Sequence, residues 1–159
     1  MIESKDNLGA QVRKAELGDL HSISEVNLKA FGNSSHPYSL RQNFDLFHET
    51  YFVAVIDNKV IGFCLAAIKP RTPESWILNI GIVPELQRKG IGTLLLRRAF
   101  KELQERGATT VSLTVDPKKA STQALYARLG FEVVGEETTY YGKDKHRLVM
   151  RARLAALQQ

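Results

Sequence analysis

The sequence of 159 residues is poor in cysteine and has no long uninterrupted apolar segment. Its one cysteine, Cys64, excludes an internal disulfide and agrees with a reducing cytoplasm. No apolar run approaches the roughly 20 residues that a membrane-spanning helix needs. Residues 1–10 carry two acidic side chains and no apolar stretch, which is not typical of a secretory signal. We therefore expect no association with a membrane.

Two familiar phosphate-binding patterns are also missing. There is no Gly-x-x-x-x-Gly-Lys-Ser/Thr segment, and Gly90-Ile91-Gly92 lacks the third glycine of a dinucleotide-binding fingerprint. The chain is basic, with a net charge of +5, but its Lys and Arg residues form neither one long run nor a nucleic-acid-binding motif. We expect no direct binding of nucleic acid, because a polyanionic ligand explains part of the charge equally well.

What the sequence does contain is a strand, a basic loop with spaced glycines, and an amphipathic helix. The run from Trp76 to Val83 is mostly apolar, which predicts a strand that is buried on both faces and ends before Pro84. From Gly92 onward, apolar residues recur with helical spacing until Gly107, which predicts the end of the helix.

The loop between that strand and helix predicts an anion site. The first N–H groups of a helix point outward and carry partial positive charge, and glycines let a ligand approach the backbone. Arg88 and Lys89 add two full charges. A phosphate is the natural ligand, although a plain strand–turn–helix connection with two solvated basic residues explains the same pattern.

The other periodicities predict one mixed α/β domain over residues 11–159, after a polar and frayed segment of residues 1–10. Asp19 is expected to cap the first helix, which has Asn27 on its apolar side, and Ser39 to Gln42 resemble a capping box after a loop ending at Pro37. The expected strands outside the central stretch are 11–15, 51–56, 60–67, 110–115, 131–134 and 147–154, and the expected helices are 19–31, one after residue 39, and 120–129.

Two segments resemble motifs of the GNAT (GCN5-related) N-acetyltransferases. Residues 83–92, VPELQRKGIG, are similar to the family's Gln/Arg-x-x-Gly-x-Gly/Ala loop, and residues 124–131, ALYARLGF, are similar to a later family segment. The resemblance covers residues 11–154. It implies an α/β enzyme with the GNAT fold, a mixed and mostly antiparallel central sheet flanked by helices. Its fourth and fifth strands would splay apart around acetyl-coenzyme A, with no metal required.

The resemblance also implies which residues hold acetyl-coenzyme A. Backbone groups of Ile80, Gly81 and Ile82 would hold the pantetheine arm and the thioester carbonyl, which requires a break in the sheet ladder. Gly81 is consistent with either a β-bulge or a packing glycine. The other implied contacts are Gln87, Arg88, Lys89, Gly90, Ile91, Gly92, Thr93, Tyr126 and Lys119, the last in place of an asparagine of the relatives.

Tyr126 matches the family tyrosine that protonates the leaving thiolate, and a half-buried tyrosine with a satisfied hydroxyl is the alternative. Twelve residues earlier, where relatives often carry the general base, this chain has Thr114, whose hydroxyl is no base at neutral pH. A water relayed through Asn79 or Thr114 would then deprotonate the amine. The other candidates are His36, Glu74 and His146, or no base at all, because an α-amine has a pKa near about 8.

Within the family, the residues most resemble the N-terminal protein acetyltransferases, in particular the ribosomal-protein-alanine type. This pattern rests on residues 78–80 (LNI), 140–141 (YY) and 36–39 (HPYS). It implies a peptide or protein N-terminus as acceptor, contacted by Phe31, Tyr140 and Tyr141. A small amine as acceptor (a polyamine, amino acid or aminoglycoside) and a coenzyme A-binding module without catalysis are the alternatives. Both a monomer and a homodimer are compatible with the sequence.

Overall fold

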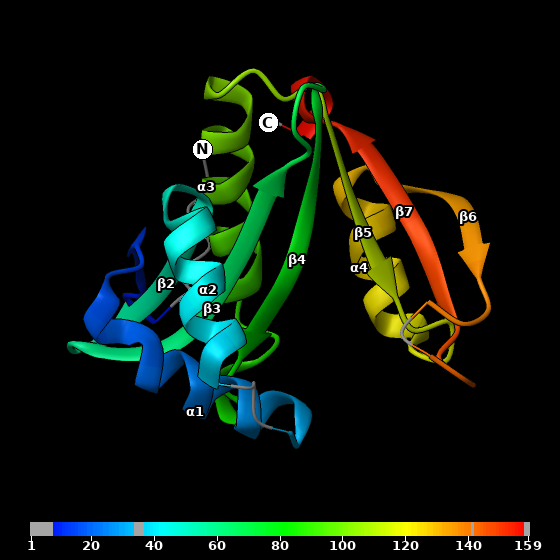
Figure 1. The fold of residues 1–159 in the computed structure, drawn as a ribbon. Helices are drawn as coiled ribbons and strands as arrows, with labels where there is room; N and C mark the ends of the chain where they lie inside the picture. The colour runs from blue at the N-terminus through cyan, green and yellow to red at the C-terminus, as the bar shows by residue number, and fades with distance from the viewer. Residues whose placement is uncertain (1–7, 34–36, 141, 158–159) are drawn as a thin grey trace.

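A computed structural model describes residues 8–33, 37–140 and 142–157 of the chain (Figure 1). In these ranges, seven strands form one sheet in the order β1-β2-β3-β4-β5-β7-β6. The strands and helices in chain order are β1 (Gln11–Lys14), α1 (Leu20–Phe31), α2 (Pro37–Phe47), β2 (Tyr51–Ile56), β3 (Lys59–Ile68), β4 (Glu74–Ile82), α3 (Ile91–Glu105), β5 (Thr110–Val115), α4 (Ala120–Leu129), β6 (Glu132–Glu137) and β7 (Arg147–Arg153). This is the predicted order of strands and helices.

The strands β4 and β5 are parallel neighbours that separate early. Their pairing runs only from Glu74 to Trp76 on β4 and from Thr110 to Ser112 on β5. From Ile77 onward β4 stays paired with β3 but has no partner on β5 within the described residues. The two strands therefore diverge toward their carboxyl ends (Figure 1), which confirms the predicted splay of the fourth and fifth strands.

Helices cover both faces of the sheet. Figure 1 shows α1 and α2 in front of β2, β3 and β4, with α3 behind them and α4 behind β5 and β7. A Cβ on Gly81 would point at Phe31 of α1, whereas a Cβ on Gly62 would point at Leu95 of α3. The splayed half of β4 thus has one face toward α1 and the other toward α3.

The end of α3 follows the sequence prediction. Gly107 has a φ of +92°, which suits glycine, and its N–H donates to the Gln104 carbonyl at 3.0 Å. The next N–H, of Ala108, donates to the Leu103 carbonyl at 3.0 Å. These two bonds form a Schellman motif, the glycine-dependent helix stop that Gly107 predicts.

Near that end of α3, Glu102 is a buried carboxylate surrounded by cations. Its oxygens lie 2.9 Å from the Lys14 ammonium, 3.1 Å from the Arg98 guanidinium and 3.1 Å from the Arg106 guanidinium. Burial alone would raise the pKa of Glu102, but the hydrogen bonds from these three cations outweigh it and hold the pKa at about 2. This cluster fastens α3 to β1 and stays charged throughout the neutral range.

Several local predictions are wrong in detail. Asp19 precedes α1 but does not cap it, because its carboxylate accepts hydrogen bonds from Arg13 (2.7 and 3.0 Å) and from the Glu16 N–H (2.7 Å). Ser39 lies inside α2 rather than at its cap, since the helix already begins at Pro37. Proline suits a first helical position, where its missing N–H would have had no partner.

Strand ends also shift by a few residues, with β4 beginning at Glu74 and β6 spanning Glu132–Glu137. Residues 1–7, most of the segment expected to be frayed, lie outside the described residues, and Ala10 is buried.

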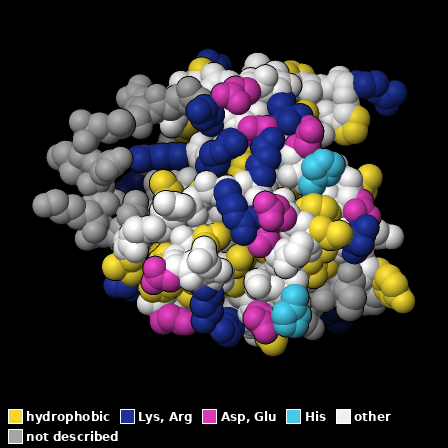
Figure 2. Space-filling view, turned by 90° about the vertical axis from the view of Figure 1, so that its left-hand side faces the viewer, with side chains coloured by type: hydrophobic (Ala, Val, Ile, Leu, Met, Phe, Trp, Pro, Cys, Tyr) yellow, Lys and Arg dark blue, Asp and Glu magenta, His cyan; other side chains and the backbone are white. Residues whose placement is uncertain are grey.

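The Cys64 thiol is buried in β3, and burial raises its pKa to about 12, so the thiol is unreactive at neutral pH. On the face shown in Figure 2, Lys and Arg side chains are interspersed with Asp and Glu. In the part of the chain that the structure describes, every helix is too short or too polar to cross a membrane. The same part holds no group of three or more His, Cys, Asp or Glu side chains arranged for a metal ion.

Candidate functional site

The helices α3 and α4 begin at the same end of the sheet. Each follows one of the two parallel strands, α3 after β4 and α4 after β5. Helix N-termini carry partial positive charge, and ligand sites in α/β sheets lie at the carboxyl ends of parallel strands that separate. Figure 1 shows this end of the molecule at the bottom of the view, where the gap between β4 and β5 is widest.

The loop before α3 forms what we call the anion cradle, residues 88–93. Arg88 and Gly90 both have positive φ angles, +63° and +85°, and these turn the chain into the helix. The Leu94 N–H makes an intrahelical bond to the Gly90 carbonyl at 3.1 Å, so the N–H groups of residues 91–93 point out of the helix end. A Cβ on Gly92 would meet no atom within 4 Å, so the space beside these groups is open.

The charged and polar side chains of the loop divide into two roles. Arg88 and Lys89, the first two residues of the cradle, are exposed and add positive charge to the helix end. Gln87 instead supports the loop, because its Nε2 donates to the Ile82 carbonyl at 3.0 Å. That bond engages one of the backbone groups of β4 that the sequence assigned to the cofactor.

A β-bulge interrupts β4 at Leu78. On β3, the consecutive residues Leu65 and Ala66 pair with Asn79 and Ile77, which leaves Leu78 as the extra residue. Leu78 is 45% exposed, so the expected burial of this strand on both faces is wrong. At this position β4 is no longer paired with β5. The break in the ladder that acetyl transfer was expected to require therefore exists, three residues before Gly81.

Gly81 itself is a packing glycine rather than the bulge. A Cβ at this position would lie 2.8 Å from the Phe63 ring and 3.1 Å from the Phe31 ring. Glycine is needed because two aromatic rings close over the strand at this point. Of the two readings that the sequence left open, the packing role is the one found.

Tyr126 approaches the splayed half of β4 from α4. The residue is 7% exposed, and its ring packs edge-on against Phe131 with 5.6 Å between centroids. The Cys64 thiol of β3 contributes to its electrostatic environment, and Cys64 is the cross-strand partner of Ile80 on β4. Burial, and then the Cys64 thiol, raises the pKa of Tyr126, so its hydroxyl keeps its proton at neutral pH. No described residue hydrogen-bonds to this hydroxyl.

On the opposite face, α1 contacts the same part of β4. The Asn79 Nδ2 donates to the Asn27 Oδ1 at 3.2 Å, and the Phe31 ring lies over Gly81. Phe31 is 45% exposed and Asn79 is half-buried, so both side chains are accessible to solvent on this face. Asn27 is a residue of this region to which the sequence assigned no role. The only feature of the sequence that could have indicated Asn27 is its polar side chain on the apolar face of the first helix.

The remaining predicted residues are spread around this end of the sheet. Thr114 is half-buried on β5 opposite Val149, and Tyr140 is exposed in the connection between β6 and β7. Lys119 is exposed at the start of α4. Tyr141, the other expected acceptor contact, lies outside the described residues.

Two of the three named base candidates are placed by the structure. Glu74 lies at the amino end of β4, where it pairs with Lys69 at 3.4 Å. Six residues of strand, roughly 20 Å, separate it from Ile80, so it is no base for a reaction there. The exposed His146, directly before β7, has its Nδ1 3.9 Å from the carboxylate of Glu136 on β6. His36 lies outside the described residues.

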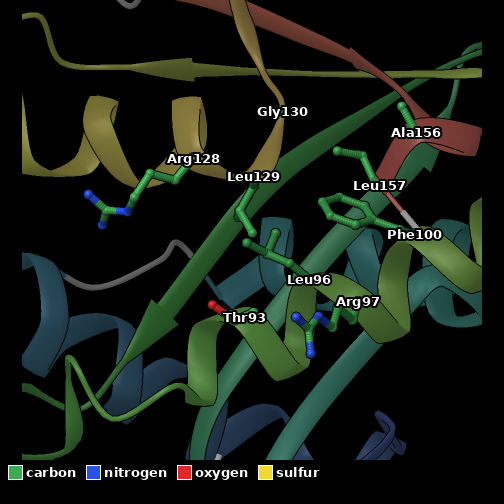
Figure 3. A pocket seen from close by; sticks show the side chains of 9 residues that line it. All are labelled: Thr93, Leu96, Arg97, Phe100, Arg128, Leu129, Gly130, Ala156 and Leu157. Atoms are coloured by element: carbon green, nitrogen blue, oxygen red, sulfur yellow. The ribbon is translucent and has the colours of Figure 1, made fainter. Parts of the chain in front are cut away.

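A cavity of about 350 Å³ adjoins the anion cradle (Figure 3). It lies between α3, α4 and the C-terminal turn η4 (Leu154–Leu157). Figure 3 shows Arg97 of α3 and Arg128 of α4 at its edge, and Thr93 near the start of α3. Leu96 and Phe100 form its apolar floor. An apolar floor edged by two guanidinium groups suits a flat ring that carries an anionic group.

Comparison with known proteins finds acetyltransferases by family, by sequence and by structure. The Acetyltransferase (GNAT) family matches residues 20–131. An N-alpha-acetyltransferase of Sulfurisphaera tokodaii is 26% identical over 163 residues, which cover 96% of this chain and 98% of the relative. The crystal structure of the ribosomal-protein-S18-alanine N-acetyltransferase from Escherichia coli gives a TM-score of 0.81 at 23% identity, covering 91% of this chain and 94% of that one. A chain of the NatC complex bound to Gag peptide and CoA gives 0.78 at 16%, covering 91% and 98%.

Proposed function

Because the chain belongs to the acetyltransferase (GNAT) family, as its motifs predicted, we propose that it transfers the acetyl group of acetyl-coenzyme A to the N-terminal α-amine of a cytoplasmic protein or peptide. The observation that carries the proposal is the outward-pointing N-terminus of α3 beside the gap between β4 and β5, with Tyr126 on the other wall. Three of the similar proteins support this acceptor: one is an N-alpha-acetyltransferase, one is named for a ribosomal protein, and the NatC complex holds a peptide and CoA.

The anion cradle and its surroundings fit this cosubstrate. The N–H groups of residues 91–93 face open space at Gly92, which is room for a pyrophosphate, and Arg88 and Lys89 supply counter-charge. The cavity edged by Arg97 and Arg128 is where we place the adenosine portion. Bound in this way, acetyl-coenzyme A supplies an acetyl group activated as a thioester.

The residues around the gap can serve each step of the transfer. The amine nitrogen forms a bond to the thioester carbon, and the carbon–sulfur bond breaks. Backbone N–H groups on the free edge of β4 would donate to the thioester oxygen as negative charge develops there. The protonated Tyr126 hydroxyl would donate a proton to the departing sulfur. The proton that the amine loses passes to water.

The absence of a carboxylate at Thr114 favours an α-amine as the acceptor. With a pKa of about 8, roughly a tenth of an α-amine is already neutral at pH 7, whereas less than about 0.1% of a lysine side chain is. An α-amine therefore reacts without a dedicated base, and Asn79 is the polar side chain that we expect to orient it. Phe31 and Tyr140, which are both exposed, are the expected contacts to the first residues of the peptide.

The test is release of coenzyme A in the presence of candidate acceptors. The panel holds peptides that differ in their first residues, the same peptides with a blocked N-terminus and an internal lysine, spermidine and an aminoglycoside. We expect turnover only with free N-termini, at rates that depend on the first residues. Turnover with spermidine or the aminoglycoside alone would assign the chain to the small-amine enzymes. Binding of acetyl-coenzyme A without any turnover would favour a module that does not catalyse.

A further inference from the structure

A short chain of side-chain amides joins β4, α1 and the segment after α1. The Asn79 Nδ2 donates to the Asn27 Oδ1 at 3.2 Å, and the Asn27 Nδ2 donates to the Asn33 backbone carbonyl at 3.0 Å. Asn27 is only 5% exposed, between the buried side chains of Ile23 and Val26 on the inner face of α1. A buried amide must find partners for both ends, and here it does.

The direction of this chain fixes how both amides are turned. A backbone carbonyl only accepts hydrogen bonds, so Asn27 must face Asn33 with its Nδ2 and Asn79 with its Oδ1. Asn79 must in turn face Asn27 with its own Nδ2. The Asn79 Oδ1 is then the end of the chain that is left over, and no described residue donates to it.

The leftover oxygen is not fully buried. Gln104 Oε1 is the one buried side-chain oxygen or nitrogen without a partner among the described residues, so the Asn79 Oδ1 retains contact with solvent. Asn79 follows the Leu78 bulge, in the half of β4 that has separated from β5. Its oxygen is therefore a fixed hydrogen-bond acceptor beside the gap, on the face opposite Tyr126.

We propose that Asn27 is a positioning residue for acetyl transfer, which presents the Asn79 oxygen to the acceptor amine. The inference rests on the proposed function. An amide oxygen accepts an N–H from the amine, which directs the nitrogen lone pair, and the contact strengthens as positive charge builds on the attacking nitrogen. The amide takes no proton, which agrees with the lack of a base at Thr114. Without Asn27, the Asn79 amide is free to rotate and offer its NH₂ group instead.

A purely structural role for Asn27 makes a different prediction, so a double-mutant cycle separates the two. The variants are Asn27→Leu, Asn79→Ala and the pair together, with Glu25→Gln on the exposed side of α1 as the control. We expect each single variant to lower kcat/KM for the acceptor about tenfold, with the KM for acetyl-coenzyme A within about twofold of wild type. The double variant should match Asn79→Ala alone within about twofold.

Losses that multiply in the double variant, or an equal loss in acetyl-coenzyme A affinity, would overturn the proposal. If Asn27→Leu does not fold, Asn27→Asp replaces it, because the carboxylate still accepts from Asn79 while it repels the Asn33 carbonyl. That variant should melt at a lower temperature yet keep kcat/KM within about threefold, and a tenfold loss would contradict the inference.

The same double-mutant cycle is repeated with the affinity for the peptide as the measured quantity, in the presence of coenzyme A. This measurement does not depend on turnover. Failure of the proposed function appears in the wild-type protein, which would then bind or acetylate no peptide N-terminus but would turn over another amine. The cycle is in that case run on that amine, with the same expected non-additivity. Additive losses with the amine that the wild type does accept would overturn the role of Asn27 on its own.

Discussion

The two faces of the splayed half of β4 are built in different ways. On the α3 face, the anion cradle is made of backbone N–H groups from one continuous stretch, residues 88–93, with Tyr126 as the added side chain. On the α1 face, the groups beside β4 are side chains from separate parts of the chain, Phe31 and Asn79, with the buried Asn27 accepting a hydrogen bond from Asn79. The α3 face is suited to a cosubstrate that is the same in every reaction, and the α1 face is suited to acceptors that differ in their side chains.

This difference has a physical basis. Backbone groups are the same whichever residue carries them, so a phosphate site needs only glycines, a helix end and nearby positive charge. An acceptor must be distinguished from other amines by its side chain, and only side chains of the protein can do that. Binding of the cosubstrate on the α3 face should therefore be lost abruptly when the backbone there is obstructed. Use of the acceptor on the α1 face should change gradually with each substitution.

The largest effect is expected from Gly92→Asp, which places a carboxylate in the open space of the cradle. We expect acetyl-coenzyme A to bind more than about 100-fold more weakly, because like charges meet at the pyrophosphate. Folding should be unharmed, since an acidic residue in the first turn stabilises a helix. The measurement is calorimetric titration. Gly18→Asp, at an exposed glycine that also has no neighbour within 4 Å, is the control and should bind normally. Unchanged affinity in Gly92→Asp would remove the cradle from the site.

A smaller effect is expected from Tyr126→Phe, which keeps the ring against Phe131 and removes the hydroxyl. Loss of a general acid should lower kcat by about 100-fold, with acetyl-coenzyme A affinity within about twofold. Tyr51→Phe is the matched control, because Tyr51 is also buried near Cys64 and burial raises its pKa to about 12. Equal losses of kcat and of affinity in Tyr126→Phe would indicate packing instead of proton donation.

The pH dependence of the wild type tests the same assignment. Because burial raises the pKa of Tyr126, the acid stays protonated across the working range, and no decline in kcat/KM should appear up to pH 9. The rising limb should follow the amine of the peptide, with a pKa near about 8. A falling limb below pH 9 would mean that the tyrosine is ionised too early to be the proton donor.

The comparison of the two faces also explains which features could be predicted. The cradle, the Gly107 helix stop and the element order lie in short contiguous patterns, and the splay came with the family resemblance. The sequence left Gly81 open as either a bulge or a packing glycine, and the bulge lies at Leu78, because the position of a bulge depends on the register with β3, which one strand's sequence does not contain. Asp19 was expected to cap α1, but Arg13 reaches it from β1. Asn27 acquires its role only when α1 docks on β4.

A moderate effect on KM and stability is expected when a methyl group is added to β4 on the α1 face or to β3 on the α3 face. Gly81→Ala would put a Cβ 3.1 Å from Phe31, which is half-exposed and can move, and 2.8 Å from the buried Phe63. We expect the acceptor KM to rise about tenfold and stability to fall by about 1–3 kcal/mol. The mirror variant Gly62→Ala would press on Ile82 and Leu95 of the α3 face. It should lower stability as well, but raise the KM for acetyl-coenzyme A instead. If both variants changed the same KM, the two faces would not be functionally separate.

The smallest kinetic effect is expected far from both faces, at Glu102 near the end of α3. With its pKa held at about 2, below the usual 4.5, this carboxylate contributes stability above pH 4.5 that is lost as the pH falls toward 2. Glu102→Gln should therefore lower the free energy of unfolding by about 1–2 kcal/mol at pH 7, a figure reduced because the three cations are partly exposed, and by much less near pH 2.5. Urea denaturation at the two pH values measures this, and both KM values should stay within about twofold. A change in kcat would show that α3 transmits strain from Glu102 to the cradle. It would contradict the idea that this end of the helix affects stability alone.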